Sequence, residues 1–116
     1  MSSPKRGEIW LADLEPTVGQ EINKTRPVVV VSGDAFGVLA LRLAAPITGA
    51  TPAKAGKVWL VPLRPTASNG LSKESVVDVF QVRSLSVARL MRQIGVMSSD
   101  DLAEVTAAIA VVLEVE

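Results

Sequence analysis

The stretch RGEIWLADLEPTVGQEINKTRPVVVVS, residues 6–32, places two apolar runs on either side of a long polar loop. The first run, residues 7–14, alternates its apolar side chains between two faces, which predicts a β-strand. The second run is four consecutive valines after Arg26 and Pro27, which predicts a strand buried on both faces. An antiparallel hairpin needs only about two to five loop residues, whereas residues 15–25 supply eleven. The loop is longer than chain reversal requires, and long loops on rigid scaffolds often carry binding groups.

Further strand-like segments follow this stretch, and no internal repeat, low-complexity tract or linker divides them. A chain of 116 residues is near the usual size of one domain, so residues 1–116 are expected to form a single domain. The strand that contains Pro62 is expected at a sheet edge, because proline has no N–H to donate to the hydrogen bonds of a neighbouring strand. Strands are expected near residues 38–45, 57–63, 74–84 and 91–97, with a turn-like or helical piece near residues 86–89.

The C-terminal segment has the periodicity of a helix. Apolar residues recur every three or four positions across residues 102–112, which predicts an amphipathic helix of about 14 residues with one face on the sheet. Ser98 or Ser99 is the expected N-cap, and Asp100 and Asp101 fall in the first turn, where the helix dipole favours anions. Several strands followed by one helix predict an α+β fold that is mainly β, built on a curved antiparallel sheet or barrel.

Composition restricts the chemistry that the chain can perform. Cysteine and histidine are both absent, which excludes disulfides, thiolate nucleophiles, imidazole acid-base pairs and the commonest metal ligands. The apolar runs are too short to span a bilayer and the N-terminus lacks a signal-peptide core, so a cytoplasmic protein without a membrane partner is expected. Basic and acidic residues number 12 each, so the net charge gives no nucleic-acid signal.

Arg26 stands where the polar loop meets the valine strand. Because Pro27 fixes the backbone beside it, the guanidinium is expected at a defined place rather than on a mobile loop tip. A salt bridge to Glu21 or Glu15 is the structural alternative for this side chain.

Several segments, in their order along the chain, resemble the MazF/PemK toxins, the ribosome-independent endoribonucleases of type II toxin-antitoxin systems. These segments are GEIW, DLEPTVGQE, RPV and PIT, and the resemblance continues through VVDVFQVRSL to the terminal helix. It implies a CcdB/MazF-like fold, a compact sheet related to the SH3-like barrel. It also implies a homodimer that holds single-stranded RNA in a groove across its face and is neutralised by a cognate antitoxin.

Cleavage of RNA without a metal or cofactor has defined chemical needs. The ribose 2′-OH must lose a proton and attack the phosphate in line, the crowded phosphorane must be stabilised, and 2′,3′-cyclic phosphate and 5′-OH ends result. The resemblance assigns the catalytic roles to Arg26 and Thr48. The pKa of arginine, above about 12, makes it a poor base, so electrostatic stabilisation is the role expected of Arg26. Taken alone, Thr48 is an ordinary strand-end threonine.

Other residues are expected to contact the substrate. Glu21 occupies the position of the family's loop carboxylate, where it can accept a proton or bind a base, although a solvated carboxylate is the alternative. Gln20, Asn23 and Lys24 lie in the same loop and can read bases or hold phosphates. We expect this loop to act as a mobile flap over RNA, with Arg26 anchored at its base.

Residues 78–81 depart from the family pattern. Many members carry a carboxylate directly before the position of Gln81, where this chain has Phe80. If the segment is one continuous strand, Asp78 and Phe80 face the same side, so Asp78 can replace the carboxylate while Phe80 stacks on a base. The alternative is that Phe80 lies in the core and Asp78 near the surface.

No metal site is expected, because Asp100 and Asp101 are adjacent on a helix and diverge by about 100°.

The function that the resemblance and the site residues predict is that of a sequence-selective, metal-independent endoribonuclease toxin. A CcdB-like toxin that binds DNA gyrase remains an alternative, and so does an RNA-binding or protein-binding module without cleavage.

Overall fold

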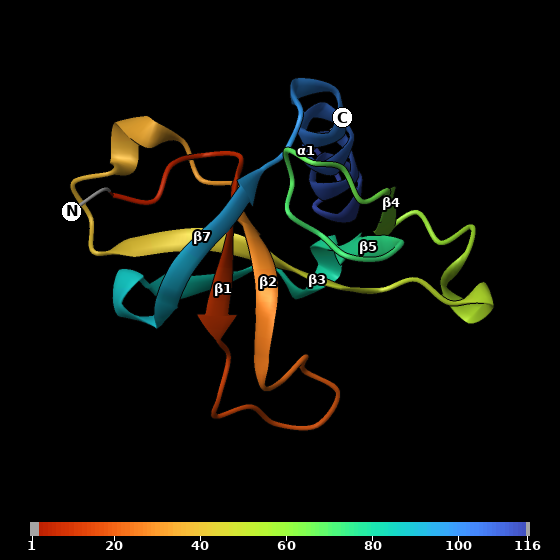
Figure 1. The fold of residues 1–116 in the computed structure, drawn as a ribbon, viewed down its shortest axis with the longest axis horizontal. Coiled ribbons are helices and arrows are strands. Elements are labelled where there is room, and N and C mark those ends of the chain that lie inside the picture. Colours follow the sequence, from red (N-terminus) through yellow and green to blue (C-terminus); the bar gives the residue numbers. More distant parts are fainter. Residues whose placement is uncertain (1–2, 116) are drawn as a thin grey trace.

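The computed structural model describes residues 3–115, which form an antiparallel sheet, several short 3₁₀ turns and a C-terminal helix (Figure 1). Across the sheet the strands follow the order β4-β5-β3-β2-β1-β7, and β6 pairs with β3. This is the α+β, mainly β fold class that the sequence predicts. The strands are β1 Glu8–Asp13, β2 Thr25–Val30, β3 Leu41–Gly49, β4 Leu60–Leu63, β5 Ser75–Asp78, β6 Arg83–Ser86 and β7 Leu90–Val96.

The valine strand β2 lies in the middle of the sheet and is buried on both faces, as predicted. Val29 packs into the core beneath the helix, whereas Val28 and Val30 pack into a second core on the other face, and all three side chains are 0% exposed. The alternation of β1 divides its side chains in the same way, with Ile9 in the first core and Trp10 in the second. The two cores fix the register of β2 against its neighbours.

The strand β3 is long and serves two parts of the sheet. Its first half pairs with β6 and β2, while residues 47–49 pair with β5. The predicted strand at residues 38–45 is therefore displaced toward the C-terminus. A 3₁₀ turn, η1 Asp34–Phe36, and the bond from Leu39 N to Phe36 O occupy the segment where the strand was expected to begin.

The predicted continuous strand at residues 74–84 is wrong. The chain forms β5, then a 3₁₀ turn, η3 Val79–Gln81, and then β6. The carboxylate of Asp78 accepts a hydrogen bond from Phe80 N at 3.1 Å, and Val82 N donates to Val79 O at 3.3 Å. A side chain that bonds to a nearby backbone N–H competes with the strand ladder, which explains the break.

The strand expected near residues 57–63 begins only at Leu60, because a turn closed by the bond from Leu60 N to Lys57 O at 3.0 Å precedes it. The other predictions agree with the structure. Strand β4 lies at the edge of the sheet as Pro62 suggests, and a 3₁₀ turn, η4 Val87–Arg89, precedes β7. The helix α1 Ser99–Val112 begins after Ser98, whose hydroxyl accepts from Asp101 N at 3.1 Å. The part of the chain that the structure describes contains no helix long and apolar enough to cross a membrane.

Candidate active site

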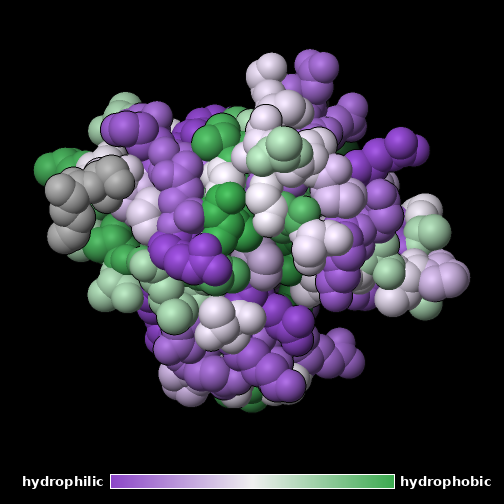
Figure 2. Space-filling model, viewed as in Figure 1, coloured by the Kyte–Doolittle hydropathy of each residue, from purple (hydrophilic) through white to green (hydrophobic). Residues whose placement is uncertain are grey.

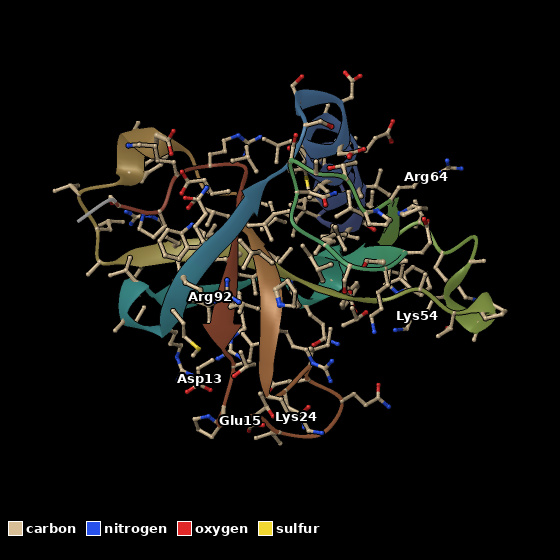
Figure 3. All side chains as sticks on the ribbon, viewed as in Figure 1. Asp13, Glu15, Lys24, Lys54, Arg64 and Arg92 are labelled. Atoms are coloured by element: carbon tan, nitrogen blue, oxygen red, sulfur yellow. The ribbon has the colours of Figure 1, made fainter. Side chains whose placement is uncertain are left out.

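The β1–β2 loop, residues 14–24, projects from the bottom of the molecule in Figure 1 and forms a hydrophilic surface in Figure 2. Its neck is closed by a bond from Leu14 N to Lys24 O at 3.0 Å and by one from Lys24 N to Glu15 Oε2 at 2.9 Å. Figure 3 shows Glu15 and Lys24 close together at this end of the molecule. Both strands thus enter the loop at a fixed separation.

The middle of the loop is tied to the turn η3 through Gln81. The Gln81 side chain accepts from Ile22 N at 2.6 Å through Oε1, and its Nε2 donates to Gln20 O at 3.1 Å. These two bonds restrain the loop, so the expected flap is held at its centre. Val18 lies further toward the tip and is 80% exposed.

A hollow of about 490 Å³ opens between the loop and η3. Pockets of this size, within the range of about 300–1,000 Å³, commonly hold small ligands or parts of larger ones. Four of the seven predicted substrate-binding residues line the hollow, whereas Asn23, Lys24 and Asp78 lie outside its lining. The lining consists of Leu14, Gln20, Glu21, Ile22, Pro46, Phe80, Gln81, Val82 and Arg83.

Arg26 is half-buried at the start of β2 and donates from Nε to Asn23 O at 3.2 Å. The carboxylates considered as its ion-pair partners are bonded to the loop's own backbone. Glu21 accepts from Val18 N at 2.7 Å, and Glu15 accepts from Lys24 N. The backbone of the loop, rather than a carboxylate, therefore holds the Arg26 side chain where the structure places it.

The register of β2 and β3 relates Arg26 to Thr48. The β2–β3 pairing ends at Val28 and Pro46, and Arg26 and Thr48 each lie two residues beyond that last pair. Arg26 pairs with Ala12 of β1, whereas Thr48 pairs with Val76 of β5. Residues two apart on a strand face the same side, so both side chains lie on the face to which Pro46 belongs. Pro46 lines the hollow, whereas Arg26 and Thr48, the two residues that the resemblance assigns to catalysis, are not among its lining residues.

Thr48 has a partner that the sequence analysis missed. Lys54 Nζ donates to Thr48 Oγ1 at 3.1 Å and to Gly49 O at 2.9 Å. The short turn η2 Pro52–Lys54 folds the chain back so that the lysine reaches the strand it has just left. No periodic pattern links residues 48 and 54, and the only available signal was Pro52, which marks a turn.

Asp78 ends β5 and feels the charge of this lysine. Burial raises the pKa of Asp78 above its usual value, while the bonds from the backbone of η3 and the charge of Lys54 partly offset that effect. The ammonium of Lys54 and the hydroxyl of Thr48 are thus in direct contact, while Arg26 supplies a guanidinium at the start of β2 and Asp78 a half-buried carboxyl group at the end of β5.

No metal site is formed by the described part of the chain. Within residues 3–115, no group of three or more His, Cys, Asp or Glu side chains is placed to hold a metal ion.

Phe80 does not occupy the core, because its side chain is 69% exposed and lines the hollow. The expectation that Asp78 and Phe80 share one strand face is also wrong, since β5 ends at Asp78 and Phe80 lies within η3. The aromatic ring nevertheless stands beside the loop, where it can contact a ligand in the hollow.

Comparison with known proteins relates this arrangement to one family. Residues 5–113 match the PemK-like, MazF-like toxins of type II toxin-antitoxin systems. Endoribonuclease MazF9 of Mycobacterium tuberculosis (strain ATCC 25618 / H37Rv) is 34% identical over 113 residues, which make up 95% of this chain and 96% of that protein.

Solved structures agree with this relationship. MazF from Deinococcus radiodurans has a TM-score of 0.83 at 29% identity, over 98% of this chain and 99% of that one. MazF in a MazE-MazF structure from the same organism has a TM-score of 0.73 at 28% identity, over 99% of this chain and 100% of that one. The family match covers the β1–β2 loop, Arg26, Thr48 and α1, and this chain therefore belongs to the PemK-like, MazF-like toxins of type II toxin-antitoxin systems.

Proposed function

We propose that this protein is a sequence-selective, ribosome-independent endoribonuclease toxin that cleaves single-stranded RNA without a metal ion. The observation that carries the proposal is the end of the β2–β3 ladder at Val28 and Pro46, because Arg26 and Thr48 each lie two residues beyond this pair and Pro46 lines the hollow. The relatives named endoribonucleases, MazF9 and the PemK of Escherichia coli, support the same activity.

The proposed reaction begins when the 2′-OH loses its proton and attacks the adjacent phosphorus in line. The bond to the 5′-oxygen breaks, that oxygen gains a proton, and the products carry 2′,3′-cyclic phosphate and 5′-OH ends. Arg26 and the Thr48 hydroxyl donate hydrogen bonds to the non-bridging oxygens, whose charge grows as the phosphorane forms. Such preorganised donors typically supply about 10²- to 10³-fold in rate each.

Proton removal from the 2′-OH falls to a carboxylate, because the chain contains no histidine. Glu21 lines the hollow, and Asp78 lies at the end of β5 with a pKa raised by burial. A raised pKa makes a carboxylate a stronger base once it is ionised. Separate Glu21→Gln and Asp78→Asn variants distinguish the two, since the base is the one whose loss removes the pH dependence of cleavage.

Substrate selection fits the shape of the site. The hollow can receive an unpaired base, whereas a stacked duplex keeps its bases inside and resists the in-line geometry. Phe80 offers a ring face for stacking, and the Gln20 and Glu21 side chains at the hollow can bond to base edges. The preference for particular sequences is proposed to come from these residues, with Asn23, Lys24 and Gln81 as further contacts.

We also propose that the protein forms a homodimer, that a cognate antitoxin covers the RNA groove, and that it acts in the cytoplasm. An exposed apolar face supports self-association, and Figure 2 shows hydrophobic residues gathered at the left, near the start of β3. The side chains of Phe36, Leu39, Leu41 and Leu43 are each 49–63% exposed there. The MazE-MazF structure supports an antitoxin partner by analogy.

The test is cleavage of a long unstructured RNA in excess EDTA by the wild type and by Arg26→Ala. We expect cuts at a repeated short motif with cyclic phosphate and 5′-OH ends, and a loss of at least about 100-fold in the variant. A circular dichroism melt of both proteins checks that the variant is folded. If diverse RNAs remain uncut, the proposal fails, and inhibition of DNA gyrase or RNA binding without scission identifies the alternative function.

A further inference from the structure

The end of β3 carries an ammonium group that is bonded directly to the site threonine. Lys54 Nζ lies 3.1 Å from Thr48 Oγ1 and 2.9 Å from Gly49 O, so two acceptors on consecutive residues hold it. Both Lys54 and Thr48 are half-buried. Figure 3 places Lys54 beside the chain that leaves β3, well away from the tip of the β1–β2 loop.

The backbone around Lys54 gives this contact a fixed geometry. Pro52 begins the turn η2, and Lys54 N closes it by donating to Thr51 O at 3.0 Å. On the other side, Ala50 N donates to Glu74 O at 3.0 Å, which continues the β3–β5 ladder beyond Gly49. The lysine is thus placed by a rigid turn against a paired strand end, which lowers the entropy lost in forming the contact.

The chemistry of the two groups fixes the direction of the hydrogen bond. A lysine ammonium has three donors and no acceptor, so Thr48 Oγ1 must accept in this bond. The threonine proton is then free to point toward a different acceptor. In the wild type, the Lys54 ammonium donates to Gly49 O. Without Lys54, the Thr48 hydroxyl can rotate and donate its proton to a backbone carbonyl such as this one instead.

The surrounding charges favour an anionic acceptor. A Cβ added at Gly49 would lie 3.1 Å from Lys73 Nζ, so a second ammonium group packs over the same strand end. Two ammonium groups, those of Lys54 and Lys73, therefore lie at the end of β3. The acidic residues nearest to them in the pairing are Glu74, whose carbonyl accepts from Ala50 N, and Asp78 at the end of β5.

We propose that Lys54 is a positioning residue for RNA cleavage, which holds Thr48 so that its hydroxyl proton points at a non-bridging oxygen of the scissile phosphate. The inference rests on the proposed function and adds a residue to it. The hydrogen bond from the positioned Thr48 hydroxyl should be stronger in the transition state than in the ground state, because the non-bridging oxygens gain charge as the phosphorane forms.

Steady-state cleavage of one RNA by four proteins tests the assignment. Lys54→Met should lower kcat about tenfold with KM changed less than about twofold, which corresponds to about 1.4 kcal/mol. Lys54→Arg should restore most of the rate, because a guanidinium can also donate to both acceptors. Lys57→Met is the matched control, since it removes the same charge from an exposed position three residues away and should retain the wild-type kcat.

A double-mutant cycle separates positioning from a general charge effect. In a Thr48→Val background, Lys54→Met should lower kcat less than about twofold further, because the hydroxyl through which it acts is gone. Losses that add in full would overturn the assignment. Equal kcat values for Lys54→Met and the wild type would also overturn it.

A second measurement tests the Lys54–Thr48 contact even if the protein proves not to cleave RNA. If the wild type cleaves no RNA, the ¹⁵N signal of the Lys54 ammonium group is compared between the wild type and Thr48→Val. A signal protected from exchange only in the wild type supports the Lys54–Thr48 link, and an unchanged signal refutes it. Cleavage tests the function, whereas this signal tests the contact.

Discussion

For Arg26 and Lys54, the sequence predicts the position along the chain better than the contacts of the side chain. The position of Arg26 follows from Pro27 and the neighbouring valines, so its place at the mouth of a buried strand could be predicted from the sequence. The group that holds its side chain could not be predicted, because it is Asn23 O and not Glu21 or Glu15, the carboxylates considered as the alternative. Lys54 was missed for a similar reason, since a turn rather than a periodic pattern brings it back to Thr48.

Phe80 is expected to bind substrate without supporting the fold. Its ring is 69% exposed, so Phe80→Leu should change the free energy of unfolding by less than about 0.5 kcal/mol. Stacking of a base on an aromatic ring contributes about 1–3 kcal/mol, so KM should rise about 5- to 150-fold. Cleavage kinetics and a thermal melt measure both quantities. An unchanged KM would show that no base stacks on Phe80.

Asp78 is expected to make stability depend on pH. Burial raises the pKa of Asp78 in the folded state, so its contribution to stability is present below the unfolded pKa and is lost as pH rises through the folded value. Asp78→Asn keeps an acceptor for Phe80 N and removes the buried charge. The variant should therefore melt at a higher temperature than the wild type at pH 7, and the difference should shrink below about pH 4. Equal differences at both pH values would contradict this account.

At the level of elements, the prediction succeeded where hydrophobic periodicity was strong. Alternation placed β1, the valine run placed β2, and the helical repeat placed α1 with its 14 residues. It failed at residues 74–84, where the pattern of apolar residues continues but Asp78 turns the backbone by bonding to Phe80 N. A local bond from a side chain to the backbone does not change the periodicity of the apolar residues. Neither the turn η3 nor the hollow beside it could therefore be predicted from the sequence.

Gln81 is the element-scale link between the turn η3 and the β1–β2 loop. Gln81→Ala removes the acceptor of Ile22 N and the donor to Gln20 O, so the middle of the loop should open more readily. Amide hydrogen exchange at Ile22 should become at least about tenfold faster, which is a local loss of about 1.4 kcal/mol. Thr66→Ala, in a different turn, is the control. Unchanged exchange at Ile22 would mean that the side chain does not restrain the loop.

The whole molecule presents two different surfaces, a hydrophilic loop end and an apolar face near the start of β3 (Figure 2). The apolar side chains there come from strand positions that alternate with buried ones, since Leu41 and Leu43 are exposed while Arg42 and Ala44 are buried. Exposed apolar patches of this kind mark interaction sites. The proposed homodimer covers this face.

Leu41→Glu is expected to weaken the dimer. The side chain is 50% exposed, so the folded monomer can accommodate the charge, whereas an apolar interface cannot. Sedimentation velocity at micromolar concentration should show a dimer for the wild type and a monomer for the variant. Val111→Glu, an equally accessible change on α1, is the control and should remain dimeric. A wild type that sediments as a monomer would contradict the proposal.

The most direct test of the central claim is cleavage of an RNA that contains a single 2′-deoxynucleotide at the scissile position. The account assigns the attack to that 2′-OH, with Arg26 and Thr48 stabilising the phosphorane. The wild type should therefore bind this RNA as tightly as the all-ribose substrate and leave it uncut, while it still cleaves unmodified sites in the same molecule. Cleavage at the modified position at the normal rate would contradict the claim, because another nucleophile would then attack the phosphate.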